Sequence, residues 1–200
     1  MQRSFGDGAF AEISNPRLSG AFDDLLGAGR YVPLTHYGWW PVSFPGFAQP
    51  PWGPPAVGWH VDGQHFHHHI DGRDQGLLPL FIFSDIFPGD GGTAYIPCSH
   101  LTTARILAQA APTGIAAKDI SALAAAAIDP ANGIEATGMP GDVLLLHPFM
   151  VHARSANTGP RVRMICNPCI GLNEPIRLGA QLQATPLERS IIGAIVKRVA

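Results

Sequence analysis

Residues 141–166 read GDVLLLHPFMVHARSANTGPRVRMIC, a stretch that alternates extended apolar runs with turn residues. Runs rich in branched or aromatic side chains and bounded by turn residues are typical of strands. Similar runs occur upstream, and we predict six strands in all, at 57–62, 78–87, 93–97, 142–147, 150–154 and 161–166. Turns are expected at 89–92 and 157–160, which are Gly-Asp-Gly-Gly and Asn-Thr-Gly-Pro. Many short strands with few helices predict a mostly β fold, an antiparallel barrel or jelly roll.

Helices are expected on either side of these strands. Asn15 followed by proline is a helix start, and Gly27 ends the apolar pattern that follows it. A second start is the capping box Thr185-Pro186-Leu187-Glu188. Between the strands, residues 101–137 are rich in alanine and favour helix, so we expect a helical insertion that stands outside the sheets.

Length and composition predict a single domain over residues 1–200. The chain has 46% hydrophobic residues, enough for a sizeable core, but only 14% charged residues. Its 23 glycines and 19 prolines favour turn-rich β structure. The oligomeric state stays open.

Several classes of partner are excluded by the same counts. A net charge of −2 with 13 Lys and Arg gives no basic surface for nucleic acid. Apolar runs are too short to cross a membrane, and the first residues form no apolar leader. Three cysteines build no disulfide framework, and the single Cys-x-x-Cys at 166–169 completes no zinc site. We expect a cytoplasmic protein that acts on a small molecule.

Histidine is unusually frequent, with nine in the chain. On the strand at 57–62, His60 and Asp62 are two residues apart and so face the same side. His147 and His152 are five apart and face opposite sides of a regular strand, so only one of them is expected in a shared site. Two histidines and one carboxylate form the open triad of non-haem Fe(II) oxygenases.

The strand at 161–166 carries Arg161 and Arg163 on one face. A buried guanidinium is costly unless it meets an anion, and its planar fork suits a carboxylate. The pair is therefore either solvated at a sheet edge or forms a carboxylate clamp.

The order of these motifs resembles the phytanoyl-CoA dioxygenase family of Fe(II)/2-oxoglutarate-dependent oxygenases. The stretches that carry the resemblance are WHVDG at 59–63, GGTAYIPCSH at 91–100 and GDVLLLHPFMVHARSAN at 141–157. It covers about residues 57–166. Cys98 stands where the family commonly has glycine. Only 59 residues precede His60, so we expect the contribution of the family's longer N-terminal region to be missing or replaced.

The resemblance implies a double-stranded β-helix, a jelly roll or cupin-like barrel with flanking helices. It implies that His60, Asp62 and His152 hold Fe(II). Arg163 is then expected to bind the distal carboxylate of 2-oxoglutarate, with Arg161 as the fallback, and His147 is not a ligand.

The resemblance also implies a dioxygenase reaction. 2-Oxoglutarate and O2 are consumed, succinate and CO2 are released, and a C–H bond of a small metabolite is oxidised. Related halogenases have a small residue in place of the carboxylate ligand, so Asp62 favours hydroxylation or desaturation. The substrate itself is not indicated by the sequence.

Two other functions stay open. The histidine-rich run at 65–69 approximates a cupin-type metal site in which His65, His67 and Asp71 would join His152. A non-catalytic β-barrel binding protein is the third hypothesis. Phe66 and Phe83, aromatic residues of the loop and strand expected near His60, are candidates for contacting substrate or else belong to the core.

Overall fold

The computed structural model describes residues 4–179 and 181–196. Its helices are α1 (Pro16–Leu26), α2 (Ser99–Gln109), α3 (Ala117–Ala126) and α4 (Pro186–Val196), with short 3-10 turns at Gly8–Ile13, Pro130–Asn132 and Gln181–Gln183. Its strands are β1 (Val42–Ser43), β2 (His67–His68), β3 (Leu78–Ile82), β4 (Ala94–Tyr95), β5 (Ile115–Ala116), β6 (Ile134–Glu135), β7 (Val143–Leu146), β8 (His152–Ala153) and β9 (Arg163–Cys166). Within the described residues, no helix has the length and hydropathy needed to cross a membrane.

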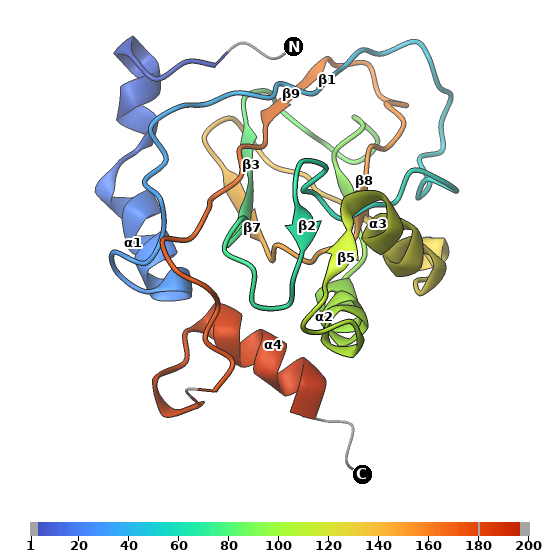
Figure 1. The fold of residues 1–200 in the computed structure, drawn as a ribbon. Helices are drawn as coiled ribbons and strands as arrows, with labels where there is room; N and C mark the ends of the chain where they lie inside the picture. Colours follow the sequence, from blue (N-terminus) through green and yellow to red (C-terminus); the bar gives the residue numbers. More distant parts are fainter. Residues whose placement is uncertain (1–3, 180, 197–200) are drawn as a thin grey trace.

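All strand pairs are antiparallel, in three sheets. One sheet has the order β1-β9-β3-β7, a second has the order β6-β4-β8, and β2 pairs with β5. The sheets occupy the centre of the molecule, with α1 on one side and α2 and α3 on the other (Figure 1). The prediction of a mostly antiparallel β core with flanking helices is confirmed.

The predicted strands are found at every position except 57–62. There the chain makes only a single bridge, between His60 and His152, because Gly58 and Gly63 both adopt positive φ and interrupt the extended run. The prediction of a regular strand at 57–62 is therefore wrong. The unpredicted strands β1, β2, β5 and β6 have two residues each, too few to show any periodicity.

The caps of both predicted helices are confirmed. At the start of α1, Leu18 N donates to Asn15 Oδ1 at 3.1 Å, and Gly27 ends the helix with φ of +91°. At the start of α4, Thr185 N donates to Glu188 Oε2 at 2.8 Å and Glu188 N donates to Thr185 Oγ1 at 3.3 Å. This is the reciprocal capping box that the sequence predicts.

The alanine-rich segment 101–137 contains most of α2 and all of α3, as expected, but it does not stand wholly outside the sheets. Its strand β5 pairs with β2, and its strand β6 pairs with β4 in the three-stranded sheet. The expectation is wrong for these two strands. They form by pairing with strands distant in sequence, and helix propensity does not predict such pairing.

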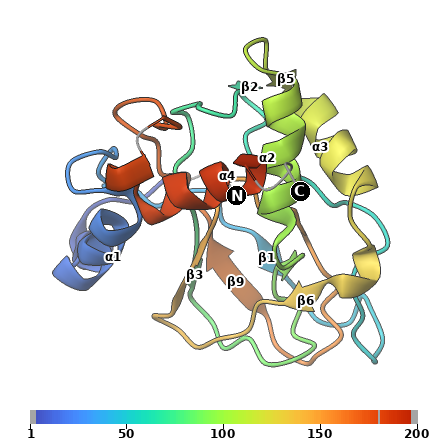
Figure 2. The ribbon, with the colours of Figure 1, turned by 90° about the horizontal axis from the view of Figure 1, so that it is seen from below.

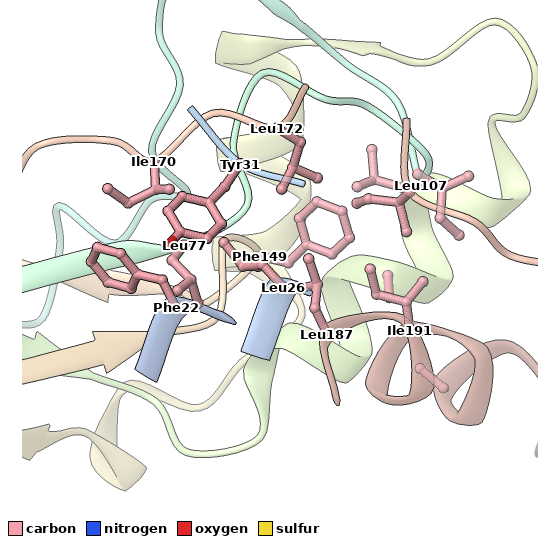
Figure 3. Close-up of a cluster of buried hydrophobic side chains, with 14 of the residues drawn as sticks. Phe22, Leu26, Tyr31, Leu77, Leu107, Phe149, Ile170, Leu172, Leu187 and Ile191 are labelled. Carbon is pink, nitrogen blue, oxygen red and sulfur yellow. The ribbon is translucent and has the colours of Figure 1, made fainter. Parts of the chain in front are cut away.

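The main apolar core lies below the sheets, where α4 crosses beneath the molecule against α1 and α2 (Figures 1 and 2). Figure 3 shows Phe22 and Leu26 of α1 and Leu187 and Ile191 of α4 gathered with Phe149. A second cluster, Leu78, Leu80, Ile82, Ile86, Ala136, Leu146, Met150 and Ile165, fills the space between the larger sheets. The apolar face of α4 is thus buried within its own chain.

Cys98 precedes α2 in the left-handed conformation, with φ of +63°. Such a conformation costs a residue with a Cβ about 1–2 kcal/mol, and glycine adopts it freely. We expect Cys98→Gly to raise the free energy of unfolding by about 0.5–1 kcal/mol in urea denaturation. Cys98→Ala keeps the Cβ and should give no gain. An equal gain in both variants would show that loss of the thiol, and not relief of the backbone, stabilises the protein.

Candidate metal centre

His60, Asp62 and His152 meet at one point. His60 and His152 are joined by two backbone hydrogen bonds, His60 N to His152 O at 2.9 Å and His152 N to His60 O at 3.0 Å. Oδ1 of Asp62 lies 3.4 Å from Nε2 of each histidine. Ligand atoms of the three residues all lie within 4.8 Å of one another, and no other group of three such side chains in the described part of the chain does so.

The backbone fixes the orientation of both imidazoles. Nδ1 of His60 lies 2.9 Å from the carbonyl of Gly58, and Nδ1 of His152 lies 3.0 Å from the carbonyl of Met150. A carbonyl accepts only, so each Nδ1 carries a proton, and each ring turns Nε2, the nitrogen left to bind a metal, toward Asp62. Metal-ligating histidines are held in this way, and two imidazole nitrogens with one carboxylate suit a divalent transition metal.

Electrostatics keep the carboxylate of Asp62 ionised. Burial alone would raise its pKa, but hydrogen bonds from His152 and His60 outweigh burial and lower the pKa of Asp62 well below its usual range. For His60 burial lowers the pKa, while Asp62 and the Gly58 carbonyl raise it above the usual value. The side chain of His152 is 5% exposed and that of His60 is 34% exposed. The centre is therefore closed on the β8 side and open beside His60.

His147 lies outside this group of potential ligands. Its Nδ1 accepts from Phe149 N at 3.1 Å, and its ring lies 4.6 Å from that of His100. Burial, with a smaller effect from His100, lowers the pKa of His147 to about 3. The folded protein therefore keeps this imidazole neutral.

Stability should depend on pH through His147. The unfolded chain protonates this side chain near pH 6.5 and the folded chain near pH 3, so the unfolded state binds more protons between these values. We expect this residue to lower the free energy of unfolding by up to about 1.4 kcal/mol per pH unit as pH falls below 6.5. Urea denaturation between pH 7 and pH 5 should show a shallower slope in His147→Asn. The exposed His36→Asn is the control, and equal slopes in wild type and His147→Asn would contradict the account.

Arg163 is buried on β9, with 1% of the residue exposed. Its Nε donates to the carbonyl of Gly91 at 2.7 Å and its Nη1 to the carbonyl of Pro41 at 3.1 Å. Gly91 lies just before β4, so the side chain reaches from the four-stranded sheet toward the sheet that holds His152. In the described residues no carboxylate forms an ion pair with Arg163.

Arg163 is a buried cation with no acidic partner in the described part of the chain. Burial lowers the pKa of its guanidinium to about 10; the exposed Arg154 also lowers this pKa, while Glu135 raises it. Arg161, the fallback residue, is half-exposed and already paired: its Nη1 lies 3.4 Å from Asp90, and its guanidinium lies over the ring of Phe87 at 4.6 Å. Of the two arginines, Arg161 is therefore the one that already has an acidic partner among the described residues.

The two candidate aromatic residues, Phe66 and Phe83, lie in different parts of the structure. The ring of Phe66 packs over Gly63, beside Asp62, so closely that a side chain at Gly63 would collide with it. Phe83 instead contacts Trp40, with ring centroids 5.0 Å apart, and lines a groove of about 640 Å³ between α1 and the outer face of β3 and β7. Alternation along β3 explains this, since Phe81 and Phe83 face outward while Leu80 and Ile82 face the inner core. The structure does not bring Phe83 to the metal centre.

The cupin-type ligand set is not assembled. His65 and Asp71 are exposed, and the exposed His67 lies 3.1 Å through Nε2 from the carbonyl of Thr113. Only the buried His68, not proposed as a ligand, points back toward the centre, with Nε2 3.1 Å from the carbonyl of Gly63. None of these residues joins His152 in a group of potential ligands.

Glu135 has no signal in the sequence that would indicate a role beside Arg163. The carboxylate of Glu135 accepts hydrogen bonds from Gly89 N, Gly91 N and Gly92 N at 2.7, 2.9 and 2.8 Å. The glycine-rich turn was visible in the sequence, but a partner 43–46 residues away was not.

An antiparallel β fold that carries two histidines and one carboxylate at a single point is typical of mononuclear non-haem metal proteins. The chain belongs to the phytanoyl-CoA dioxygenase (PhyH) family, whose sequence pattern matches residues 5–165. No curated protein matches the sequence.

Solved structures with a similar fold include that of EvdMO1, with a TM-score of 0.51 and 19% identity over 82% of this chain and 33% of that one. The non-heme alpha ketoglutarate dependent carbocyclase SnoK from nogalamycin biosynthesis has a TM-score of 0.47 and 20% identity over 82% of this chain and 58% of that one. EvdO2 from Micromonospora carbonacea var. aurantiaca has a TM-score of 0.43 and 16% identity over 70% of this chain and 52% of that one. The chain thus spans from one third to a little over half of the length of these proteins.

Proposed function

We propose that this protein is an Fe(II)- and 2-oxoglutarate-dependent dioxygenase that hydroxylates a C–H bond of a small metabolite. The observation that carries the proposal is the cluster of His60, Asp62 and His152, in which both histidines turn Nε2 toward one carboxylate oxygen. Family membership supports the same activity. We further propose that the chain forms one domain and that its two larger sheets build a double-stranded β-helix.

The three residues fit Fe(II). Three ligands leave three positions of an octahedral ion open, which is the arrangement needed to bind a chelating cosubstrate and O2. Iron, when bound, supplies the activation of O2 that is coupled to the oxidative decarboxylation of 2-oxoglutarate. The balance is one C–H bond, one O2 and one 2-oxoglutarate consumed, and one alcohol, one succinate and one CO2 formed.

The protein's own residues position the reactants. Gly58 and Met150 carbonyls hold the imidazoles and the ionised Asp62 completes the ligand set, so the site is formed before metal arrives. Because Asp62 occupies the position that a halide would need, hydroxylation or desaturation is favoured over halogenation. Substrate is expected to approach beside His60 and Phe66, the open side of the centre.

Arg163 is proposed to bind the distal carboxylate of 2-oxoglutarate. Among the described residues its buried guanidinium has no acidic partner and donates to two carbonyls, which leaves donors for a bidentate carboxylate. The exposed Arg154, two residues after His152, adds positive charge that favours an anionic cosubstrate.

Succinate formation tests the proposal. Purified protein with Fe(II), O2 and 2-oxoglutarate should release succinate slowly even without substrate, and the Asp62→Ala variant should not. Release that is independent of Fe(II), or equal in the variant, would contradict the proposal. No release, with iron and 2-oxoglutarate nevertheless bound by wild type, would favour the non-catalytic binding protein. A small-molecule substrate and a cytoplasmic location belong to the same proposal.

A further inference from the structure

The side chain of Glu135 occupies a loop built to bind an anion. Three backbone N–H groups of the glycine-rich turn 89–92 point at its two carboxylate oxygens, at 2.7 to 2.9 Å. Successive N–H groups that converge in this way form an anion-binding concavity. Here the anion is part of the chain itself, because β6 pairs with β4 and brings Glu135 against the turn.

The same turn holds Arg163. Gly91 donates its N–H to Glu135 and accepts, through its carbonyl, the hydrogen bond from Arg163 Nε at 2.7 Å. The turn packs closely against its neighbours, since a side chain at Gly91 would collide with Asn157 and one at Gly92 with the carbonyl of Ala136. Glu135, the turn and Arg163 therefore form one connected unit.

We propose that Glu135 is a positioning residue that orients Arg163 for the distal carboxylate of 2-oxoglutarate, an inference that rests on the proposed function. Glu135 forms no ion pair with the guanidinium and acts through the Gly91 carbonyl. Its negative charge also favours the charged form of the buried Arg163, since it raises the pKa that burial lowers. Arg163 thus stays cationic without being neutralised by a direct contact.

The test compares two 2-oxo acids on the Fe(II)-loaded protein without O2. 2-Oxoglutarate has the distal carboxylate and pyruvate lacks it, so only the first reports on Arg163. In Glu135→Gln the Kd of 2-oxoglutarate should rise about 10-fold to 100-fold, the effect of losing hydrogen bonds to a charged group. The Kd values of pyruvate and of Fe(II) should not change.

Matched controls separate this role from a general loss of structure. Asp142→Asn removes another carboxylate that accepts a backbone hydrogen bond in a turn, from Met139 N at 2.8 Å, and should leave both 2-oxo acids unaffected. If Glu135→Gln does not fold, Glu135→Asp keeps the charge, shortens the side chain and should show the same selective loss. Combining Glu135→Gln with Arg163→Lys should add little to the effect of Arg163→Lys alone, because both changes act on one guanidinium.

Three results would overturn the proposal. One is an unchanged Kd of 2-oxoglutarate in Glu135→Gln. A second is an equal weakening of pyruvate, which would make Glu135 a scaffold for the whole centre. The third is full additivity with Arg163→Lys. If the wild-type protein bound iron but no 2-oxoglutarate, the proposed function itself would be contradicted. In the three results above, wild type binds 2-oxoglutarate and only the role of Glu135 is contradicted.

Discussion

Asp62→Ala is expected to weaken Fe(II) binding by about 100-fold or more. Loss of residues that merely support metal ligands costs about 10- to 100-fold in affinity, and Asp62 is the one carboxylate in the ligand set. The two remaining ligands would be neutral imidazoles, so no negative charge would be left to offset the positive charge of the metal. Equilibrium titration with Fe(II) under anaerobic conditions measures the effect.

Two variants of the histidine-rich run serve as controls for Asp62→Ala. Asp71→Ala removes an exposed carboxylate that the cupin-type alternative would use, and His67→Ala removes one of the histidines of that alternative. Both should bind one Fe(II) with wild-type affinity. Tight binding in Asp62→Ala together with its loss in His67→Ala would reverse the assignment of the metal centre.

The second large effect is expected at Arg163. Replacing it with methionine, which is similar in length and uncharged, should raise the Kd of 2-oxoglutarate about 30-fold to several thousand-fold. Truncating one member of a buried charged pair typically costs about 2–5 kcal/mol, because the partner stays buried and unpaired. The affinity for Fe(II) should stay close to that of wild type, since Arg163 is not among the metal ligands.

Arg161→Met is the matched control for Arg163→Met. Arg161 is half-exposed and already engaged by the buried Asp90 and the ring of Phe87, so its loss should change the Kd of 2-oxoglutarate by less than a few-fold. Arg163→Lys keeps the positive charge but lacks the planar guanidinium. It tests whether a variant with that charge also binds 2-oxoglutarate more weakly than wild type. A larger effect in Arg161→Met than in Arg163→Met would transfer the carboxylate contact to the fallback residue.

What the sequence predicts well in this protein is local. The caps at Asn15 and Thr185 depend on residues three positions apart, so the helix starts can be read directly. His60 and Asp62 were identified by their spacing, and the structure brings them together with His152. They meet through a single bridge with His152, not along a regular strand, because positive φ at Gly58 and Gly63 isolates the segment.

What the sequence does not show depends on partners far away in the chain. The contact between Glu135 and the turn at 89–92, and the pairing of β2 with β5, join segments that share no pattern. The sequence predicts Phe83 near the site because it lies in a strand expected beside His60, but the alternation along β3 turns its side chain to the other face. The pairing of His100 with His147 likewise follows from packing and has no local signal.

The central claim is most directly tested by adding 2-oxoglutarate to the Fe(II)-loaded protein without O2 and recording the visible absorption spectrum. Chelation of iron by a 2-oxo acid gives a charge-transfer band, and no substrate is needed to observe it. The account predicts a band that saturates at one iron and one 2-oxoglutarate per chain, and that requires more 2-oxoglutarate in Arg163→Met. Iron bound at the centre with no band at any 2-oxoglutarate concentration would contradict it.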